Sequence, residues 1–209
     1  MISLLAIDTT TQSCSVALLH EERLTSRFQI APRQHTELIL PMINELLAER
    51  QLVCGDVEAI AFAAGPGSFM GTRLAVGVAQ GLAYALSIPL IPVSTLHILA
   101  QTAYEACGAK QVLSGWDARM GEVYWGIYAC DNGMMQPQQA DQLSMLSAVT
   151  APDDHYMRVG NIWGNDEAII YPQATALITL AKPRFKAGEV ISALAVEPIY
   201  LRTAVVKEG

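Results

Sequence analysis

The sequence predicts an α/β fold, in which strands and helices alternate along much of the chain. Three observations support this prediction. Apolar and β-branched runs bounded by turn residues recur as strands, and longer segments with helical periodicity separate several of them. One strand, residues 57–64, is apolar on both faces and is therefore expected at the centre of a sheet. The 209 residues suffice for one large domain or two small ones.

The chain is expected to begin as an antiparallel meander that leads into a helix. The strands of this meander are separated by polar, turn-forming residues and are predicted over residues 2–7, 14–19 and 24–30. A helix over residues 37–50 follows, with Pro41 in or near its first turn, where the missing N–H group is best tolerated. The central strand then leads to a second helix.

This second helix, predicted over residues 69–86, is apolar nearly all round. It carries two rows of small residues at four-residue spacing: Gly71, Ala75, Ala79 and Ala83 in one row, and Gly77, Gly81 and Ala85 in the other. Rows of small residues allow another helix to approach closely. A glycine inside a helix costs about 1 kcal/mol relative to alanine, so we expect packing to compensate.

The remaining elements are less regular. A short strand at residues 90–93 precedes a helix over 95–106, which Ser94 is expected to cap and Gly108 to end. We place a lobe boundary at residues 106–110. The later elements are expected as two strands at 112–116 and 123–129 around a turn, helices near 173–180 and 188–197, and a final segment at 199–202.

Composition limits the classes of function. The formal net charge is −7 and no Lys/Arg-rich run is present, so the chain alone is a poor candidate for binding nucleic acid. Four scattered cysteines without metal spacing indicate a reducing compartment. The apolar N-terminus meets Asp8 too early for a signal peptide. Residues 74–93 contain Gln80, Pro89 and Pro92 and favour a buried helix and strand over a membrane span.

The loop AGPGSFMGTR, residues 64–73, is similar to a phosphate-binding loop but satisfies neither common motif. A Walker A loop requires a lysine that is absent here, and Met70 occupies the third glycine position of a dinucleotide fingerprint. A strand, a tight turn and a helix N-terminus with free N–H groups remain. Two interpretations stay open: a tight connection only, or a nucleotide or anion site. The residues of that site are Asp8, Thr9, Gly65, Gly67 and Ser68.

Neither a metal site nor a catalytic set emerges from the sequence. A metal pair on a helix that includes His35 would need a ligand four residues on, where Ile39 stands. Asp8, Asp117 and Glu122 are polar residues at strand ends, but no Ser-His-Asp or Cys-His set can be assembled from them. We therefore assign no catalytic and no metal-binding residue, and expect His35 to cap or pack at the start of its helix.

Several segments together resemble the bacterial TsaB (YeaZ) family of tRNA threonylcarbamoyladenosine biosynthesis proteins. They are AIDTTTQSCSVAL, RQHTELILPMI, AAGPGSFMGTRLAVGVAQGLA, IPVSTL, DARMGEVYWG and the terminal YLR. The resemblance implies a two-lobed actin-like, Hsp70-like (ASKHA) fold with a mixed sheet flanked by helices in each lobe. We expect an N-terminal lobe at residues 1–107 and a smaller lobe at 108–189, with residues 190–209 returning to the first. Met70 and Thr72 stand where the family usually has Thr and Leu.

The resemblance also implies a function. TsaB-like proteins are non-catalytic, scaffolding cytoplasmic partners of TsaD, a paralogue that carries a metal-binding histidine pair, and of TsaE, an ATPase. The complex transfers the threonylcarbamoyl group from threonylcarbamoyl-AMP to N6 of adenosine 37 in tRNAs reading ANN codons. This chain is then expected to bind no cofactor tightly, since the complex uses ATP through TsaE. It is expected to form a homodimer when alone, to reach tRNA only through the complex, and to contact no membrane.

The first two helices are the expected surface for TsaD, since they are apolar and rich in small residues. The residues expected near this interface are Leu38, Met42, Leu46, Gly71, Ala75 and Ala79. Two other classes of function remain as alternatives: a glycoprotease-like metallohydrolase, as the family was once described by similarity, and a stand-alone ASKHA nucleotide-binding protein.

Overall fold

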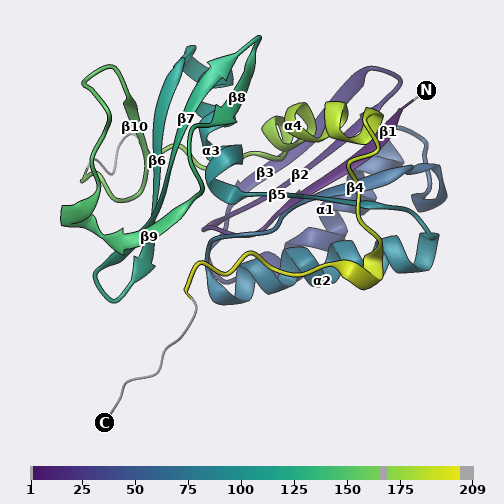
Figure 1. The fold of residues 1–209 in the computed structure, drawn as a ribbon. Helices are drawn as coiled ribbons and strands as arrows, with labels where there is room; N and C mark the ends of the chain where they lie inside the picture. Colours follow the sequence, from purple (N-terminus) through teal and green to yellow (C-terminus); the bar gives the residue numbers. More distant parts are fainter. Residues whose placement is uncertain (1, 165–168, 203–209) are drawn as a thin grey trace.

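The computed structural model describes residues 2–164 and 169–202 and contains two mixed β-sheets that lie side by side (Figure 1). The first sheet has the order β3-β2-β1-β4-β5, and the second has the order β10-β6-β7-β8, with β9 also pairing with β7. The strands of the first sheet are β1 (Ser3–Asp8), β2 (Ser13–His20), β3 (Arg23–Ile30), β4 (Ala59–Ala63) and β5 (Leu90–Val93). Those of the second are β6 (Gln111–Arg119), β7 (Glu122–Asp131), β8 (Met134–Pro137), β9 (Gln142–Met145) and β10 (Met157–Gly160).

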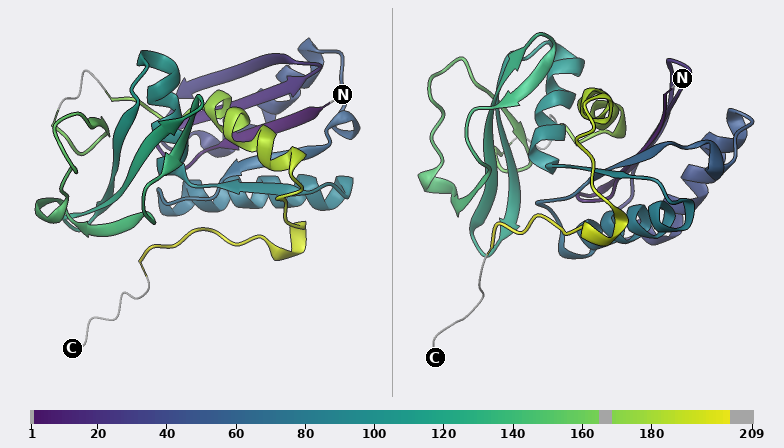
Figure 2. Two further views of the ribbon diagram at one scale, coloured as in Figure 1. Left: turned by 45° about the horizontal axis from the view of Figure 1, so that its top comes forward. Right: turned by 45° about the vertical axis from the view of Figure 1, so that its right-hand side comes forward.

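Helices cover both faces of the first sheet. The helices are α1 (His35–Glu49), α2 (Phe69–Leu86), α3 (Thr95–Cys107) and α4 (Ala174–Lys186), with short 3₁₀ turns η1 (Cys54–Asp56), η2 (Leu146–Ala148) and η4 (Ala193–Ala195). Helices α1 and α2 pack on one face, and α4 with part of α3 packs on the other (Figure 2). Helix α3 also packs against the second sheet, so it joins the two lobes.

Strand β1 shows why both faces of the first sheet are apolar. Leu5 and Ile7 point towards α1 and α2, whereas Leu4 and Ala6 point towards α4, and all four are buried. Strands β1, β2 and β3 are antiparallel, while β4 and β5 run parallel to β1. This mixed sheet between two helical layers confirms the predicted actin-like α/β fold.

The two rows of small residues in α2 face opposite ways. Gly71 and Ala79 are buried against the sheet side of the helix. A Cβ atom at Gly71 would lie 2.0 Å from the carbonyl oxygen of Thr9, so only glycine permits this approach. Gly77 and Gly81 face solvent, and a Cβ atom at either would meet nothing within 4 Å. The first row therefore serves packing within the chain, and the second does not.

The C-terminal part differs from expectation in two respects. Helix α4 was expected in the lobe at 108–189, but it packs against the first sheet. The lobe boundaries themselves stay a prediction. The prediction of a helix near 188–197 is wrong, since only the short turn η4 forms there. Ile191 instead pairs in extended conformation with Leu90.

The segment after η4 then runs along α2 to the second lobe (Figure 2). The Ile199 N–H group donates to the Ala64 carbonyl oxygen at 2.7 Å, while Arg202 contacts Ala118 and Glu122 of the second lobe. Residues 203–209, which were expected to return to the first lobe, lie outside the described residues. None of the helices in the described ranges is long and apolar enough to span a bilayer, and residues 74–93 form a helix end and β5 as predicted.

A matched pair of substitutions in α2 tests the two roles of its glycines. Gly71→Ala is expected to lower the free energy of unfolding by about 1–3 kcal/mol, because the added methyl group overlaps the Thr9 carbonyl. Gly81→Ala is expected to raise it by up to about 1 kcal/mol, because alanine favours the helix and meets no neighbour. Urea unfolding of both variants measures the difference. Equal effects of the two substitutions would contradict this assignment of the two faces.

Candidate functional site

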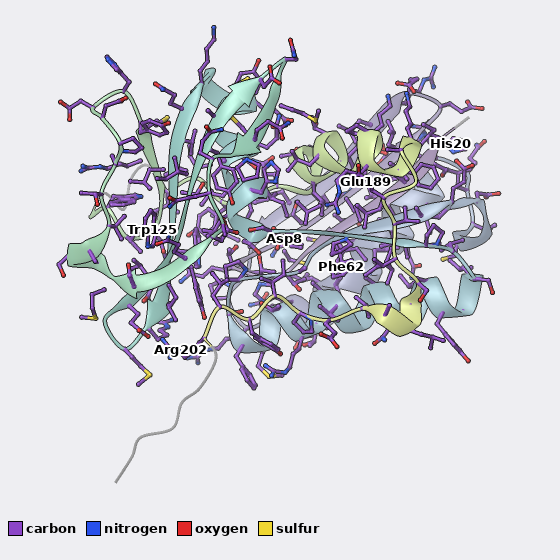
Figure 3. All side chains as sticks on the ribbon, viewed as in Figure 1. Asp8, His20, Phe62, Trp125, Glu189 and Arg202 are labelled. Carbon is purple, nitrogen blue, oxygen red and sulfur yellow. The ribbon has the colours of Figure 1, made fainter. Side chains whose placement is uncertain are left out.

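A cleft of about 660 Å³ lies between the two lobes. Five segments line it: the β1–β2 loop, the loop and first turn of α2, the β6–β7 hairpin, Asn161 directly after β10, and the C-terminal segment at residues 199–202. Figure 3 shows Asp8 between the lobes and Arg202 at the end of the C-terminal segment. The lining residues that the following argument uses are Gly67, Ser68, Phe69, Thr72, Arg73, Trp116, Asp117, Arg119, Tyr124, Tyr200 and Arg202.

The loop before α2 is held in place by the β1–β2 loop. Gly65 has a φ of +100°, which favours glycine, and the Gly65–Pro66 peptide bond is cis. The Ser68 N–H group donates to the Thr10 carbonyl at 2.7 Å. The Ser68 hydroxyl oxygen accepts from the Gly71 N–H group at 3.1 Å and caps the helix. A Cβ atom at Gly67 would lie 2.5 Å from the Thr10 carbonyl oxygen, so the two loops are in backbone contact.

This contact buries Asp8 and Thr9 beneath the cleft. The Asp8 carboxylate accepts from the Thr10 N–H group at 2.8 Å and the Thr10 hydroxyl at 2.7 Å. Its second oxygen has no partner among the described residues. Burial raises the pKa of Asp8 to about 6, against the lowering effect of the Thr10 hydrogen bonds. The Thr9 hydroxyl donates to the Gly71 carbonyl at 2.7 Å and is equally buried.

The five residues predicted for an anion or nucleotide therefore divide. Gly67 and Ser68 line the cleft, and contact with a ligand stays a prediction for them. Asp8 and Thr9 are fully buried and do not line it, and contact with a ligand stays a prediction for them as well. Gly65 is also buried, and a Cβ atom there would lie 2.9 Å from the Ile199 carbonyl oxygen. The buried residues Asp8, Thr9 and Gly65 therefore lie behind the loop, whereas Gly67 and Ser68 face the cleft.

Aromatic and cationic side chains form much of the remaining wall. The Arg73 guanidinium lies 3.3 Å from the centroid of the Phe69 ring and 5.3 Å from that of Tyr200. Arg119 pairs with Asp117 at 3.2 Å, and Arg202 pairs with Glu122. Among residues 2–164 and 169–202, Arg73 has no ion-pair partner.

Sequence reasoning missed most of this wall. Trp116 and Tyr124 are cross-strand neighbours in the β6–β7 pair, and both line the cleft. The signal was present in the segments DARMGEVYWG and YLR, which supply Tyr124, Tyr200 and Arg202. Nothing in these segments alone showed that the turn near residue 120 and residues 199–202 lie close to the loop at residue 67.

A second polar cluster joins the lobes away from the cleft and was not predicted. Asp141 accepts hydrogen bonds from the Tyr128 hydroxyl at 2.5 Å and from the Ser94 hydroxyl at the start of α3. Burial raises the pKa of Asp141, although both hydrogen bonds oppose the shift. His97 stacks on Tyr128 with ring centroids 5.1 Å apart, and its Nε2 lies 2.6 Å from the Met135 carbonyl oxygen. Burial lowers the pKa of His97. This cluster fixes the second sheet to the β5–α3 junction.

The histidine singled out in the sequence has a local role. His35 Nε2 lies within hydrogen-bonding distance, 3.2 Å, of the Ser13 carbonyl oxygen at the start of α1. This bond agrees with the expectation that His35 packs at the helix start. In the part of the chain that the structure describes, no group of three His, Cys, Asp or Glu side chains is arranged to hold a metal ion.

The residues predicted near a partner interface lie mostly inside the chain, and their proximity to a partner stays a prediction. Met42, Leu46, Gly71, Ala75 and Ala79 are all buried inside the chain. Leu38 is half-buried and packs against the same core. The helical period places these residues on the faces of α1 and α2 that meet the sheet, so a partner cannot touch five of the six directly.

The opposite side of α2 is exposed and almost free of charge. We name the outer α2 face by its exposed residues from the middle of the helix onward: Gly77, Gly81, Tyr84 and Ala85. Tyr84 is 68% exposed, and half-buried Leu74, Val78 and Leu82 border the row. Arg73 is the one charged residue in the 18 residues of α2.

Comparison with known proteins identifies related chains. The family model described as "TsaD: tRNA N6-adenosine threonylcarbamoyltransferase" matches residues 25–160. A relative from Escherichia coli K12 is 36% identical over 97% of this chain and 95% of its own length, and one from Haemophilus influenzae is 38% identical over 98% and 95%. Both are named tRNA threonylcarbamoyladenosine biosynthesis protein TsaB.

Two solved structures from Pseudomonas aeruginosa are also similar. One is described by its similarity to peptidase YEAZ, with 42% identity, a TM-score of 0.92 and coverage of 97% of this chain and 100% of that one. The other is YeaZ, with 41% identity, a TM-score of 0.90 and coverage of 96% and 100%. Identity and TM-scores at this level over nearly full length show that this chain shares the fold of these two proteins.

The buried carboxyl group of Asp8 predicts a pH-dependent stability. Its pKa in the folded state, about 6, lies above the ordinary value of 3.8, so the folded state holds this proton more tightly. The stabilisation is complete below about pH 4 and is lost as the pH rises to about 6, which amounts to about 3 kcal/mol. Asp8→Asn keeps an acceptor for Thr10 and removes the ionisation. We expect it to unfold at higher urea than the parent chain at pH 7, with a difference that shrinks towards pH 4.

Asp153→Asn, in an exposed turn, is the matched control and should not change the pH profile. Urea unfolding at several pH values measures all three chains. A difference between Asp8→Asn and the parent that stays constant from pH 4 to pH 7 would contradict the prediction.

Proposed function

Because this chain belongs to the TsaB family, we propose that it is the non-catalytic, scaffolding subunit of a cytoplasmic complex that forms threonylcarbamoyladenosine in tRNA. In this proposal a TsaD-type paralogue carries the catalytic groups and moves the threonylcarbamoyl group from threonylcarbamoyl-AMP to N6 of adenosine 37 in tRNAs reading ANN codons. A TsaE-type ATPase uses the ATP, and this chain binds no cofactor tightly.

The names of the relatives support a role in threonylcarbamoyladenosine biosynthesis, and the match to the TsaD family model supports a partner of the TsaD type. The E. coli and H. influenzae proteins carry the biosynthesis name over nearly the same length as this chain. The TsaD family model matches residues 25–160, which include α1, α2 and all strands of the second sheet. A partner built on the same plan would present an equivalent pair of helices, and two such surfaces suit a pseudo-symmetric pairing.

The outer α2 face is the observation that carries the subunit role. Gly77 and Gly81 each cost the helix about 1 kcal/mol relative to alanine, and neither makes a close contact inside the chain. Exposed glycines four residues apart leave a shallow groove where a partner helix can approach the backbone. Tyr84 and the bordering Leu74, Val78 and Leu82 add apolar area beside this groove.

Charge supports an indirect contact with tRNA. The formal net charge of the chain is −7, and nucleic acid is attracted to positive surfaces. The role of holding tRNA therefore fits the partner subunits, while this chain positions them. The proposal includes a homodimer for the isolated chain, formed through the same outer α2 face.

Reconstitution tests the proposed function directly. We expect purified TsaD and TsaE, with tRNA and a supply of threonylcarbamoyl-adenylate, to modify adenosine 37 only when this chain is added. Mass spectrometry of nucleosides from the digested tRNA measures the product. Full modification without this chain, or modification by this chain with TsaD omitted, would contradict the non-catalytic role.

A substitution on the outer α2 face tests the interface. Gly81→Glu is expected to abolish co-elution with TsaD, because a long charged side chain would lie between the two helices. The variant is expected to fold with an unchanged or higher melting temperature, because the new side chain meets no atom of its own chain within 4 Å of Cβ. Size-exclusion chromatography and thermal unfolding measure the two outcomes.

Ala148→Glu supplies the matched control, since Ala148 is exposed in η2 of the second lobe. This variant should still pair with TsaD. Normal pairing of Gly81→Glu would place the partner elsewhere, and loss of pairing in both variants would indicate a charge effect rather than a local contact.

A further inference from the structure

The tip of the β6–β7 hairpin carries an exposed thioether in contact with a guanidinium group. Met120 is 68% exposed, and Nη1 of Arg202 donates to its sulfur at 3.1 Å. We propose that Met120 is a site of reversible oxidation by hydrogen peroxide. Its sulfoxide form binds Arg202 more strongly and thereby tightens the attachment of the C-terminal segment to the second lobe. This inference does not depend on the partner subunits or on the proposed function.

Local sequence preference does not account for a methionine at this position. Met120 and Gly121 form a two-residue loop between Arg119 and Glu122, which pair across the hairpin. Both loop residues have positive φ angles, +60° and +80°, as in a type I′ turn. The first position of such a turn favours Asn, Asp or Gly, and a left-handed conformation is unfavourable for a long side chain. We therefore expect the side chain of Met120 to have a role that compensates for this cost.

The guanidinium of Arg202 is held by three groups of one hairpin. Nη2 contacts the Glu122 carboxylate and, at 3.3 Å, the Ala118 carbonyl oxygen, while Nη1 contacts the Met120 sulfur. The side chain of Arg202 is only 22% exposed. A fixed cation therefore lies beside a sulfur-containing side chain that a small oxidant can reach from solvent.

The oxidation step is a two-electron reaction of the thioether. A lone pair of the sulfur attacks one oxygen of hydrogen peroxide, so an S–O bond forms while the O–O bond breaks. The departing hydroxide takes the proton from the new S–OH group, which leaves the sulfoxide and one water molecule. Sulfur loses two electrons and the peroxide gains them. The Arg202 N–H group is placed to stabilise the negative charge that develops on oxygen. Methionine sulfoxide reductases reverse the reaction.

The product is a better partner for Arg202 than the thioether is. A thioether sulfur accepts hydrogen bonds weakly, whereas the polar oxygen of a sulfoxide accepts them well, and a charged donor strengthens the bond further. The flexible methionine side chain allows this oxygen to turn towards the guanidinium. Three residues before Arg202, the Ile199 N–H group donates to the Ala64 carbonyl oxygen. A firmer hold on Arg202 should therefore make local opening at Ile199 less frequent.

Two other methionines provide comparison within the same chain. Met70 and Met145 are 70% and 54% exposed, and within the described ranges neither sulfur accepts a hydrogen bond. Exposure alone would make Met70 the first of these residues to be oxidised. The proposal instead places Met120 first. Met135 is fully buried, so its oxidation reports unfolding of the chain.

Peptide mass spectrometry of the isolated full chain, after timed exposure to hydrogen peroxide, tests the selectivity. Met120 is expected to be oxidised at least about threefold faster than Met70. Arg202→Gln, which shortens the side chain and removes the charge, is expected to bring the Met120 rate to that of Met70 or below. Arg27→Gln is the matched control, since Arg27 is paired with Glu45 and Glu49 far from the hairpin, and it should keep Met120 first. Protection of Met135 shows that each variant stays folded.

Hydrogen exchange tests the consequence for the C-terminal segment. After peroxide treatment the Ile199 amide of the parent chain is expected to exchange at least about threefold more slowly, and sulfoxide reductase should restore the original rate. Met120→Asn is the control, because asparagine suits the turn and carries no sulfur. It should fold at least as stably as the parent chain, and peroxide should leave its Ile199 exchange unchanged.

Three results would overturn the proposal. The first is oxidation of Met120 no faster than that of Met70, and the second is a preference for Met120 that survives Arg202→Gln. The third is exchange at Ile199 that is unchanged or faster in the oxidised parent chain, or that slows equally in Met120→Asn. Reconstitution of tRNA modification is a separate measurement, so failure of either proposal leaves the other standing.

Discussion

The close backbone contact between the start of α2 and the β1–β2 loop is the constraint on which the rest of the structure depends. Gly67 and Gly71 bring carbonyl groups of Thr10 and Thr9 within distances that no side chain allows. This contact fixes the angle at which α2 leaves the first sheet. It also decides which side of the helix faces the core, because Ala75 and Ala79 follow Gly71 at helical spacing.

The positions of two parts of α2 follow from that angle. The N-terminal turn of α2 points into the space between the lobes, and the later turns present Gly77 and Gly81 to solvent. One helix therefore lines the interior cleft with its first turn and exposes an almost uncharged face in its later turns. The sealed loop beneath it, with the carboxyl group of Asp8, provides rigidity at some cost in stability at neutral pH.

The sequence was sufficient to predict the fold class, the order of the elements from β1 to β7, and the family. It could not tell which row of small residues in α2 faces the sheet, because Ala75, Ala79, Gly77 and Gly81 have the same spacing and similar polarity. The distinction depends on the Gly71–Thr9 contact, which is made by residues 62 positions apart. Gly67 and Ser68 were recognised as candidates because they lie in one loop motif. Trp116, Tyr124 and Arg202 were not recognised, because only the folded chain brings them to that loop. The false helix at 188–197 shows that a pairing with Leu90 overrides local preference.

The C-terminal segment has a mechanical consequence. It is attached to the first lobe at Ile199, through Ala64, and to the second lobe at Arg202, through Glu122. Three residues of extended chain span at most about 11 Å. The C-terminal segment therefore links the two lobes at this side of the cleft. A wide separation of the lobes here would require the Ile199–Ala64 hydrogen bond or the Arg202–Glu122 ion pair to break. The two lobes are therefore expected to move relative to each other by a twist or a small slide rather than by a wide hinge opening.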